Sequence, residues 1–460
     1  MIRFCRNLAN PSPYSPLILL LLLVPLLLLL PLPFLLLCSN FNVVENFESL
    51  TQLPLIFQSF EKWISPNWVV SIDDYGAKGN GVNDDTKAFM DAWEAVCSCS
   101  SRSVLEIPAG KIYLVGPIDF GGPCQSKVTL VVSGTVVAPK NPEIWDGLNP
   151  RKWLYFHGVD HLTVGGGGNI NGMGEKWWAR SCKINTTNPC RHAPTAVTFH
   201  RCSNLKVRKL MILNSQQVHI AFTNCYKVKV SHLKIIAPVD SPNTDAIHIS
   251  ASKRVEVRDS IIETGDDCIS IVSNTSAVRI KNIACGPGHG ISIGSLGKHH
   301  SCDEVQDVLV DGAFLSNTEN GVRIKTWQGG SGFVRDIDFR NVWMNNVSNP
   351  IIIDQYYCDS QIPCPNQTLS VKVERVSFRG ISGTSATEEA IFLACSDSFP
   401  CEKILLNNIQ LFYVGGNTSS YCWKASGTSF GPVYPHPCFS CDEHFIKYKV
   451  LSSTAHCSIS

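Results

Sequence analysis

The chain has 460 residues, of which 44% are apolar and 17% are charged, with 39 Lys and Arg against 38 Asp and Glu. This near balance excludes the broad basic surface that binds nucleic acid, so a charged ligand needs a local site. The 33 glycines and the dispersed apolar residues are typical of a folded chain and not of a disordered polymer.

The N-terminus predicts export from the cytosol. Arg3 and Arg6 precede an uncharged, leucine-rich stretch over 17–37 that ends at Cys38. A positive segment before such a stretch is typical of a secretory signal, or of a signal anchor where it is not cleaved. We predict a signal peptide or anchor over 1–38 and a linker or pro-segment over 39–68. No membrane contact is expected unless the leader stays attached.

The cysteine count fits an oxidising compartment. Without Cys5 and Cys38, 18 of the 20 cysteines remain, an even number that indicates disulfides. Three short loops are candidate closures, and an alternative is half a zinc site at Cys438 and Cys441 with His436 and His444, which we disfavour. Five Asn-x-Ser/Thr sequons agree with a secretory route. The candidate loops are Cys182–Cys190, Cys358–Cys364 and Cys395–Cys401, and the sequons are at Asn185, Asn274, Asn346, Asn366 and Asn417.

One segment has the spacing of a helix. From Asp85 to Cys97 the apolar residues fall on one face, and we expect this helix near the start of a domain over 69–460 that ends in a cysteine-rich segment. The apolar face is made by Ala88, Phe89, Ala92, Trp93 and Val96. The rest of the domain is predicted to be all-β.

A repeat of short apolar strands decides the fold class. The intervals between the last apolar residues of consecutive strands are 23, 27, 22, 22, 31 and 29 residues. Self-similarity at this period, in strands without helices, predicts a parallel β-helix. A large sandwich or barrel is the alternative, but the turns that mark antiparallel hairpins are rare here. The strands are 197–199, 220–222, 247–249, 269–271, 291–293, 322–324 and 351–353.

The repeat brings distant polar residues together. Asp245, Asp267 and His289 are separated by 22 and 22 residues, so they form a column on successive coils about 5 Å apart, with Asp266 beside it. On the next coil, Arg323 and Lys325 flank an inward Ile324, and alternation sends both outward next to the column. Each charge alone could be a solvated strand face, but stacked carboxylates repel one another and need another explanation.

This group of side chains suits the cleavage of a glycosidic bond. Clustered carboxylates raise at least one pKa, so one acid can donate a proton to the leaving oxygen while another activates water. Arg and Lys bind carboxylates. The residues therefore predict a glycoside hydrolase that acts on an acidic sugar.

Four motifs follow one another along the chain: Asn243-Thr-Asp245, Gly265-Asp-Asp-Cys268, Gly288-His-Gly290 and Arg323-Ile-Lys325. In this order they resemble the motifs of the polygalacturonases, the pectin-cleaving family 28 of glycoside hydrolases, and the similarity to plant members extends over about 69–446. The resemblance implies a single-stranded right-handed parallel β-helix, like that of the pectin lyases. It also implies inverting, single-displacement hydrolysis of α-1,4-galacturonide bonds in pectin or polygalacturonate. A bridge between Cys268 and Cys285 is implied as well.

The resemblance also assigns roles. Asp266 is the general acid, Asp245 and Asp267 hold and activate the water, and His289 tunes the protonation of the acid. Arg323 and Lys325 bind the substrate carboxylate, and Tyr357 lines a neighbouring subsite. No metal and no cofactor is implied, and we expect a monomer that is secreted to the cell wall.

Two features leave questions open. Ala246 stands where the family usually has Gly, and its methyl group is expected to narrow the cleft floor or to move Asp245. Trp177, Trp178 and Trp327 are candidates either for stacking on sugars or for the core. The alternatives to a polygalacturonase are a rhamnogalacturonan or xylogalacturonan hydrolase, a lyase on the same scaffold, and a catalytically inactive wall-binding homologue. Intact Arg323 and Lys325 favour plain galacturonate.

Overall fold

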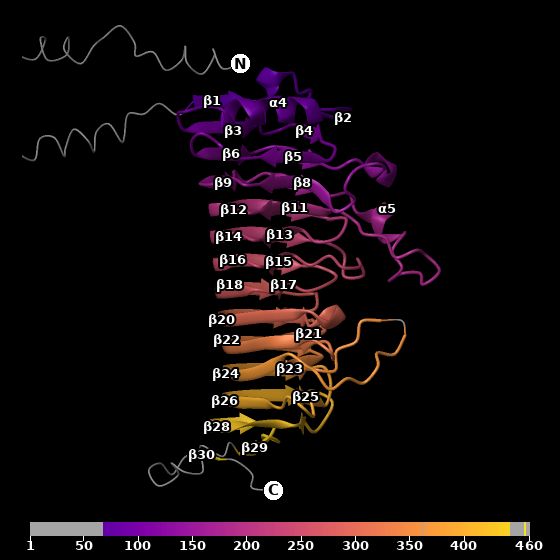
Figure 1. The fold of residues 1–460 in the computed structure, drawn as a ribbon, viewed down its shortest axis with the longest axis vertical. Helices are drawn as coiled ribbons and strands as arrows, with labels where there is room; N and C mark the ends of the chain where they lie inside the picture. Colours follow the sequence, from indigo (N-terminus) through magenta and orange to yellow (C-terminus); the bar gives the residue numbers. More distant parts are fainter. Residues whose placement is uncertain (1–67, 361, 442–454, 457–460) are drawn as a thin grey trace, which may run out of the picture.

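The protein is an elongated stack of coils, described by a computed structural model over residues 68–360, 362–441 and 455–456 (Figure 1). Each coil adds strands to sheets that run the length of the stack. One sheet has eleven strands, and each pairs in parallel with the next along the chain. They are β5 (Ile118–Gly121), β8 (Lys152–His157), β11 (Thr195–His200), β13 (Ile220–Thr223), β15 (Ile247–Ser250), β17 (Ile269–Ile271), β19 (Ile291–Leu296), β21 (Asn320–Thr326), β23 (Asn349–Asp354), β25 (Glu389–Ala394) and β27 (Ser419–Trp423).

The second sheet has nineteen strands and covers the other sides of the stack. Its strands are β1 (Trp68–Ser71), β2 (Asn80–Asp84), β3 (Ser103–Ile107), β4 (Ile112–Leu114), β6 (Val128–Val132), β7 (Thr135–Val137), β9 (Leu162–Gly165), β10 (Asn169–Asn171), β12 (Ser203–Leu213), β14 (Tyr226–Ile236), β16 (Lys253–Glu263), β18 (Thr275–Cys285), β20 (Cys302–Ser316), β22 (Ser331–Val347), β24 (Lys372–Ser385), β26 (Cys401–Tyr413), β28 (Ala425–Tyr434), β29 (Ser440–Cys441) and β30 (Ala455–His456). The antiparallel pair β28–β30 closes the series. The fold is the predicted right-handed parallel β-helix, the hand that parallel crossovers almost always take.

The predicted strand repeat is confirmed residue by residue. The last apolar residue of each predicted strand pairs with that of the next, as in Ile249 with Ile271 and Ile271 with Ile293. These side chains form one fully buried column inside the stack. Burial of each isoleucine contributes about 1.5–3 kcal/mol, so the column favours this register over a slip by one residue, which would turn the apolar side chains outward.

The long strands of the second sheet turn a corner at a left-handed residue. In β14, β16 and β18 this residue is His232, Asp259 or Asn282, each with φ near +50°. The three are aligned on neighbouring coils. A further left-handed residue stands earlier in each of these strands, namely Lys227, Arg254 or Ala277. Left-handed residues bend the strand, so one strand contributes to two sides of the stack.

The predicted helix is confirmed as α4 (Thr86–Cys97), and its five predicted apolar residues are buried. It packs on β1, β3 and β5 and lies at the N-terminal end of the stack (Figure 1). A one-turn helix, α5 (Glu175–Trp178), was not predicted, because four residues carry no periodic signal. The short 3₁₀ turns are η4 (Ile72–Tyr75), η5 (Pro142–Trp145) and η6 (Lys298–His300).

Six disulfides join described cysteines, and they include all four bridges expected from loops or from resemblance: Cys182–Cys190, Cys268–Cys285, Cys358–Cys364 and Cys395–Cys401. The other two are Cys97–Cys124 and Cys422–Cys438. The second of these overturns the half zinc site, since the Cys438 sulfur is bonded to another sulfur. Four described cysteines are free: Cys99, Cys202, Cys225 and Cys302.

Several predictions fall on residues outside the described ones. The leader over 1–38 and almost all of the linker over 39–68 are among them, as is His444. Within the described ranges, no helix has the length and apolar character that a membrane crossing needs.

Candidate active site

The strand register places the predicted column. Asp245, Asp267 and His289 each stand two residues before a strand, namely β15, β17 and β19, which pair in register. The Ala246 N–H donates to the Asp267 carbonyl oxygen over 3.0 Å. The column therefore forms on successive coils, as the equal sequence steps predict.

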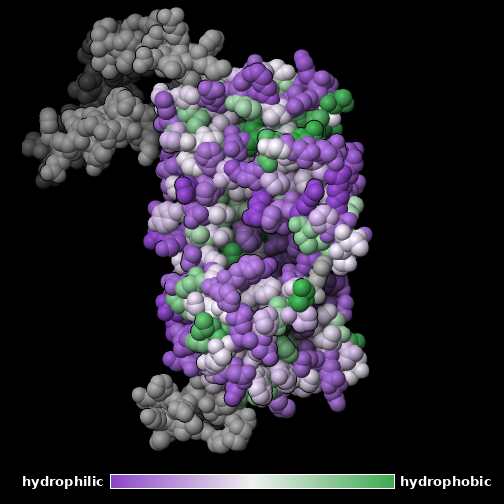
Figure 2. Space-filling view, turned by 45° about the vertical axis from the view of Figure 1, so that its right-hand side comes forward, coloured by the Kyte–Doolittle hydropathy of each residue, from purple (hydrophilic) through white to green (hydrophobic). Residues whose placement is uncertain are grey.

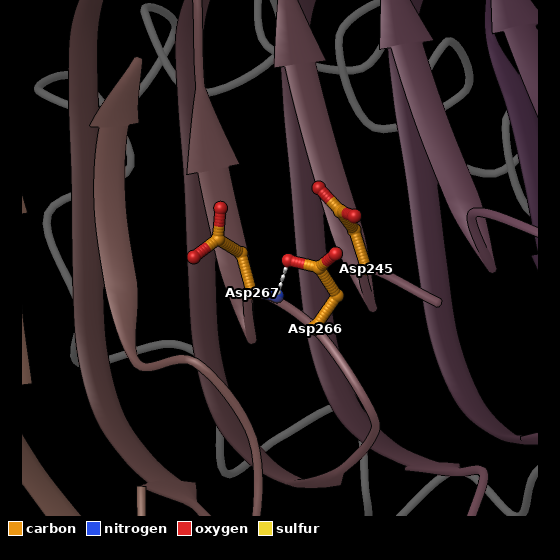
Figure 3. A group of neighbouring side chains, drawn as sticks. All are labelled: Asp245, Asp266 and Asp267. Atoms are coloured by element: carbon orange, nitrogen blue, oxygen red, sulfur yellow. Dashed lines mark hydrogen bonds between the residues drawn. The ribbon is translucent and has the colours of Figure 1, made fainter. Parts of the chain in front are cut away.

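Three carboxylates converge at this point. Asp245, Asp266 and Asp267 each bring one oxygen within 4.8 Å of the oxygens of the other two, and their side chains lie side by side next to the starts of the strands (Figure 3). Burial raises the pKa of Asp245 well above its usual range, and the charges of Asp266 and Asp267 raise it further. The cluster can therefore hold a proton that isolated aspartates would release.

Asp267 is kept ionised by its neighbours. It accepts hydrogen bonds from Arg323 Nη2 and Lys325 Nζ, both at 2.8 Å, and from Ser292 Oγ at 2.7 Å. Burial by itself would raise the pKa of this carboxyl, but Lys325 and Arg323 outweigh burial and lower the pKa to about 2. Two aspartates on neighbouring coils thus differ in which protonation state is stable.

Arg323 and Lys325 lie beside the column as predicted, but they are not a solvated face. Each is only 7% exposed, because their charged ends turn onto Asp267. The alternation of side chains along the strand predicted on which side Arg323 and Lys325 lie, but it could not predict that both turn onto Asp267. Arg has five N–H donors and Lys has three, so both retain donors for a ligand while they hold Asp267.

A second hydrogen-bond chain supports Asp245, and the sequence reasoning missed it. The Ser270 hydroxyl donates to Asp245 Oδ2 over 2.8 Å, and Ser270 Oγ lies 2.8 Å from His248 Nδ1. Burial lowers the pKa of His248 to about 4, so its ring is neutral at higher pH. His248, Ser270, Ser292 and Arg323 occupy one aligned row of the sheet, and this register is the signal that could have identified them.

Asp266 faces the predicted histidine. His289 Nδ1 lies 3.1 Å from Asp266 Oδ1, and His289 Nε2 lies 3.1 Å from a carboxylate oxygen of Glu319. Burial opposes the charged imidazolium, but Asp266 and Glu319 overcome it, and the pKa of His289 is raised. Asn243 Nδ2 also donates to Asp266, over 3.3 Å. Glu319 was missed, because it stands on a turn outside the regular repeat.

The backbone around His289 requires glycine. Gly290 has φ +84°, and a Cβ there would lie 2.0 Å from the carbonyl oxygen of Asn320. Directly after the acids, the Cys268–Cys285 bridge ties the end of the Asp266–Asp267 turn to β18. Both features fix the turns that present the carboxylates and the imidazole.

Aromatic residues border the site on the side of the basic pair. Tyr357 is partly buried, and its ring lies edge-on to the ring of Trp327, with the two centroids 5.6 Å apart. The centroid of the Tyr357 ring lies 5.4 Å from Lys325 Nζ. Burial raises the pKa of the Tyr357 hydroxyl. Trp327 therefore packs beside the site. Trp177 packs edge-on to Trp145, and Trp178 Nε1 donates to the Ser215 carbonyl oxygen.

The expectation that Ala246 narrows the cleft floor is wrong. Its side chain has no exposed surface and belongs to the apolar core. The residue follows Asp245, whose side chain points outward, so its own methyl group points inward. A direct steric effect of this methyl group on a ligand in the cleft is excluded.

The carboxylates lie in a cleft of about 620 Å³. Figure 2 shows a hydrophilic hollow midway along the face that carries the loops. Lys183 and Asp359 also line this cleft and form an ion pair across it. Their two disulfide-closed loops, 182–190 and 358–364, are therefore joined over the site, 176 residues apart in sequence. A second hollow of about 730 Å³ shares Pro242 and Asn243 with the cleft and extends it toward the N-terminal coils.

Three close carboxylates are also a ligand set that divalent cations use. Here, however, Asp267 already accepts hydrogen bonds from two cationic side chains and a hydroxyl. Its charge is compensated, so a cation would have to compete with Arg323 and Lys325. We assign no metal to the cluster.

Comparisons with known proteins agree with these observations. The family model described as "Glycosyl hydrolases family 28" matches residues 97–430. The chain is 56% identical to a probable polygalacturonase of Arabidopsis thaliana, over 88% of this chain and 92% of that protein. It is 51% identical to a polygalacturonase of Persea americana, over 77% of this chain and 76% of that protein. The structure resembles a hyperthermoactive exopolygalacturonase from Thermotoga maritima with a TM-score of 0.66 and 20% identity, covering 79% of this chain and 91% of that one.

Proposed function

The chain belongs to glycosyl hydrolase family 28, and from this membership and its acid cluster we propose that it hydrolyses α-1,4-galacturonide bonds in polygalacturonate. The observation that carries the proposal is a group of carboxyls with opposite pKa shifts, one raised and one lowered, beneath a cleft that also contains an Arg and a Lys. Glycoside hydrolysis needs a protonated and an ionised carboxyl at one bond.

Arg323 and Lys325 are proposed to bind the carboxylate of a galacturonate residue. Their free N–H donors support this role, since a guanidinium and an ammonium beside each other match an anionic sugar. Tyr357, at the edge of Lys325, is proposed to line the neighbouring subsite. Substitution of Arg323 or Lys325 by an uncharged residue should weaken the binding of galacturonate more than the binding of its methyl ester.

Asp266 is proposed to donate the proton to the leaving oxygen. It lies in the cleft beside His289, whose raised pKa favours a positive ring that can hold and return a proton. Asp245 and Asp267 are proposed to hold the attacking water. The low pKa of Asp267 supports an ionised partner for that water.

One observation stands against a simple division of roles. In the unliganded protein the raised pKa belongs to Asp245, whereas family resemblance gives the proton donor as Asp266. The two are compatible if the proton is shared within the cluster, because closely coupled carboxyls titrate as a group. Asp245 then has to lose its proton before it can activate water.

The carboxylate spacing is also unusual for the proposed inversion. Inverting glycosidases usually separate their carboxyls by about 6.5–9.5 Å, and retaining ones by about 5 Å. Here oxygens of all three aspartates come within 4.8 Å of one another. Inversion is therefore proposed from resemblance and not from distance. Proton NMR of the first product decides it, since inversion of an α-linked substrate releases the β-anomer and retention the α-anomer.

The assignment of the acid is tested with Asp266→Asn and Asp245→Asn on two substrates. Polygalacturonate needs a proton donor, whereas a galacturonosyl fluoride has a leaving group that departs without one. We expect Asp266→Asn to lose activity on the polymer and to keep it on the fluoride, while Asp245→Asn loses both. Asp240→Asn, an exposed acid on a nearby turn, serves as the matched control. Loss of fluoride cleavage in Asp266→Asn would reassign the acid.

The same assay separates the proposed substrate from the alternatives. Wild-type protein that cleaves rhamnogalacturonan or xylogalacturonan but not polygalacturonate would move the proposal to those hydrolases. Wild-type protein that binds polygalacturonate and cleaves none of the three would favour an inactive wall-binding protein.

We propose that the protein acts as a secreted, glycosylated monomer in the cell wall. Six disulfides support an oxidising compartment. All five sequon asparagines are exposed, so each is accessible to modification: Asn185, Asn274, Asn346, Asn366 and Asn417. A mobility change on enzymatic deglycosylation and a monomer mass by light scattering would support this proposal.

A further inference from the structure

The row of the sheet that forms the cleft floor continues into a group of aromatic residues that are exposed or half-buried. Arg323 pairs with Ile352, Ile352 with Phe392, and Phe392 with Tyr421, on strands β21, β23, β25 and β27. Phe392 and Tyr421 therefore lie two and three coils from Arg323, about 10 and 15 Å toward the C-terminal end. In Figure 1, β23 and β25 follow β21 in that direction. We call Tyr356, Phe392, Tyr421 and Trp423 the aromatic platform.

The aromatic platform is accessible and flat in part. The rings of Phe392 and Tyr421 are stacked, with centroids 5.2 Å apart and an angle of 19° between their planes. Tyr421 is 41% exposed and Trp423 is 45% exposed. The platform residues line a hollow of about 510 Å³ together with Asp354, Ala394 and Asp397. Exposed aromatic rings beside a polysaccharide cleft offer an apolar surface to the C–H face of a sugar ring.

Two carboxylates give the platform the opposite charge to the centre of the cleft. Asp397 accepts hydrogen bonds from Tyr356 Oη and Trp423 Nε1, both at 3.1 Å. Asp354 lies one coil beyond Lys325 in the same row, and burial raises the pKa of its carboxyl, so its negative charge is present only at a higher pH than that of an ordinary aspartate. The described residues that line this hollow include no Lys or Arg. An anionic galacturonate would meet like charges here, whereas an uncharged residue would not.

We propose that the aromatic platform is a subsite for an uncharged residue of the pectin chain, namely a methyl-esterified galacturonate. The inference rests on the proposed function, since it extends the same cleft along the same polymer. The ester has no charge to be repelled by Asp354 and Asp397. Its ring hydroxyls can donate to these carboxylates while its apolar face lies on Phe392 and Tyr421.

Binding tests the subsite independently of hydrolysis. In an Asp266→Asn background, which keeps the ligand intact, titration calorimetry would compare partially methyl-esterified hexagalacturonate with the unesterified hexamer. We expect Phe392→Ala and Tyr421→Ala to raise the Kd of the esterified ligand about twofold to tenfold, the range that an aromatic contact supplies. The Kd of the unesterified ligand should change by less than twofold. Trp343→Ala, which removes a more exposed aromatic side chain on β22 of the other sheet, should change neither Kd.

The charges are tested by Asp397→Asn, which keeps one acceptor oxygen and so can retain one of the two hydrogen bonds, and by Asp354→Asn. Both should improve binding of the unesterified hexamer and narrow its difference from the esterified one. Equal weakening of both ligands by the aromatic variants, or no weakening of either, would overturn the proposal. Preference for an unesterified, xylose-substituted hexamer over the methyl ester would also overturn it. Failure of the wild-type protein to cleave polygalacturonate would count against the proposed function alone, because the binding comparison needs no turnover.

Discussion

Arg323→Ala is expected to damage stability, protonation and binding together, because Arg323 holds Asp267 as well as facing the cleft. The substitution removes the 2.8 Å hydrogen bond to Asp267 and the 3.0 Å hydrogen bond from Arg323 Nε to Ser292. Asp267 is then left buried with Lys325 as its single cationic partner. Loss of one partner from a buried ion pair lowers the free energy of unfolding by about 3–5 kcal/mol. Because Lys325 still compensates the charge of Asp267, we expect a loss near the lower figure.

The pKa of Asp267 gives a second measure of the effect. The difference between the ordinary value of 3.8 and about 2 corresponds to roughly 2 kcal/mol, at about 1.4 kcal/mol for each pKa unit. Because the folded pKa is below the unfolded one, this stabilisation is present above about pH 4 and is lost as the pH falls toward 2. In Arg323→Ala the pKa of Asp267 rises, so the contribution shrinks and its loss begins at higher pH.

Urea unfolding at pH 6, 4 and 3, together with the pH profile of kcat/KM, measures both effects. We expect a loss of about 3 kcal/mol at pH 6, a smaller difference from wild type at pH 3, and an acid limb of kcat/KM displaced to higher pH. Arg323→Lys is the control that keeps the charge without the fork, and it should recover part of the stability. An unfolding free energy within about 0.5 kcal/mol of wild type, with an unmoved acid limb, would refute the reasoning.

Two further substitutions test contacts that the sequence did not reveal. Ser270→Ala removes the hydroxyl that donates to Asp245, so the pKa of Asp245 should rise further and the acid limb of kcat should move to higher pH, with KM little changed; a KM effect alone would contradict this. Lys183→Ala breaks the ion pair that joins the two loops over the cleft. The kcat/KM for polygalacturonate should then rise relative to that for trigalacturonate. The rise should be less than about fivefold, because exposed ion pairs contribute less than about 1 kcal/mol. A double variant with Asp359→Ala should add nothing, and additive effects would show that the two side chains act separately.

The sequence predicted what repeats. Equal steps of 22 residues located Asp245, Asp267 and His289 on adjacent coils, since a strand register fixes the position of every residue that precedes it by the same number. The same register determined on which side Arg323 and Lys325 lie. The register held because shifting one strand by one residue would expose a column of buried isoleucines.

What does not repeat could not be predicted in this way. Glu319 reaches His289 from a turn, and Lys183 meets Asp359 between two loops whose lengths follow no period. The orientation of Ala246 was misjudged, because the chain bends between Asp245 and the strand and two successive residues, Ala246 and Ile247, both point inward. Turn geometry depends on the contacts of each turn and not on the period of the coil.

Charge changes sign along the groove, and this order gives a bound polymer a direction. Passing toward the C-terminal end, the floor presents the carboxylate cluster at Asp245 and Asp266, then the cationic pair that covers Asp267, then the aromatic platform with Asp354 and Asp397. A uniformly anionic chain would be attracted only to the middle of this series. A chain that carries a charged residue over Arg323 and an uncharged one over Phe392 satisfies both, so the pattern of esterification, and not charge alone, should decide which bond lies over Asp266.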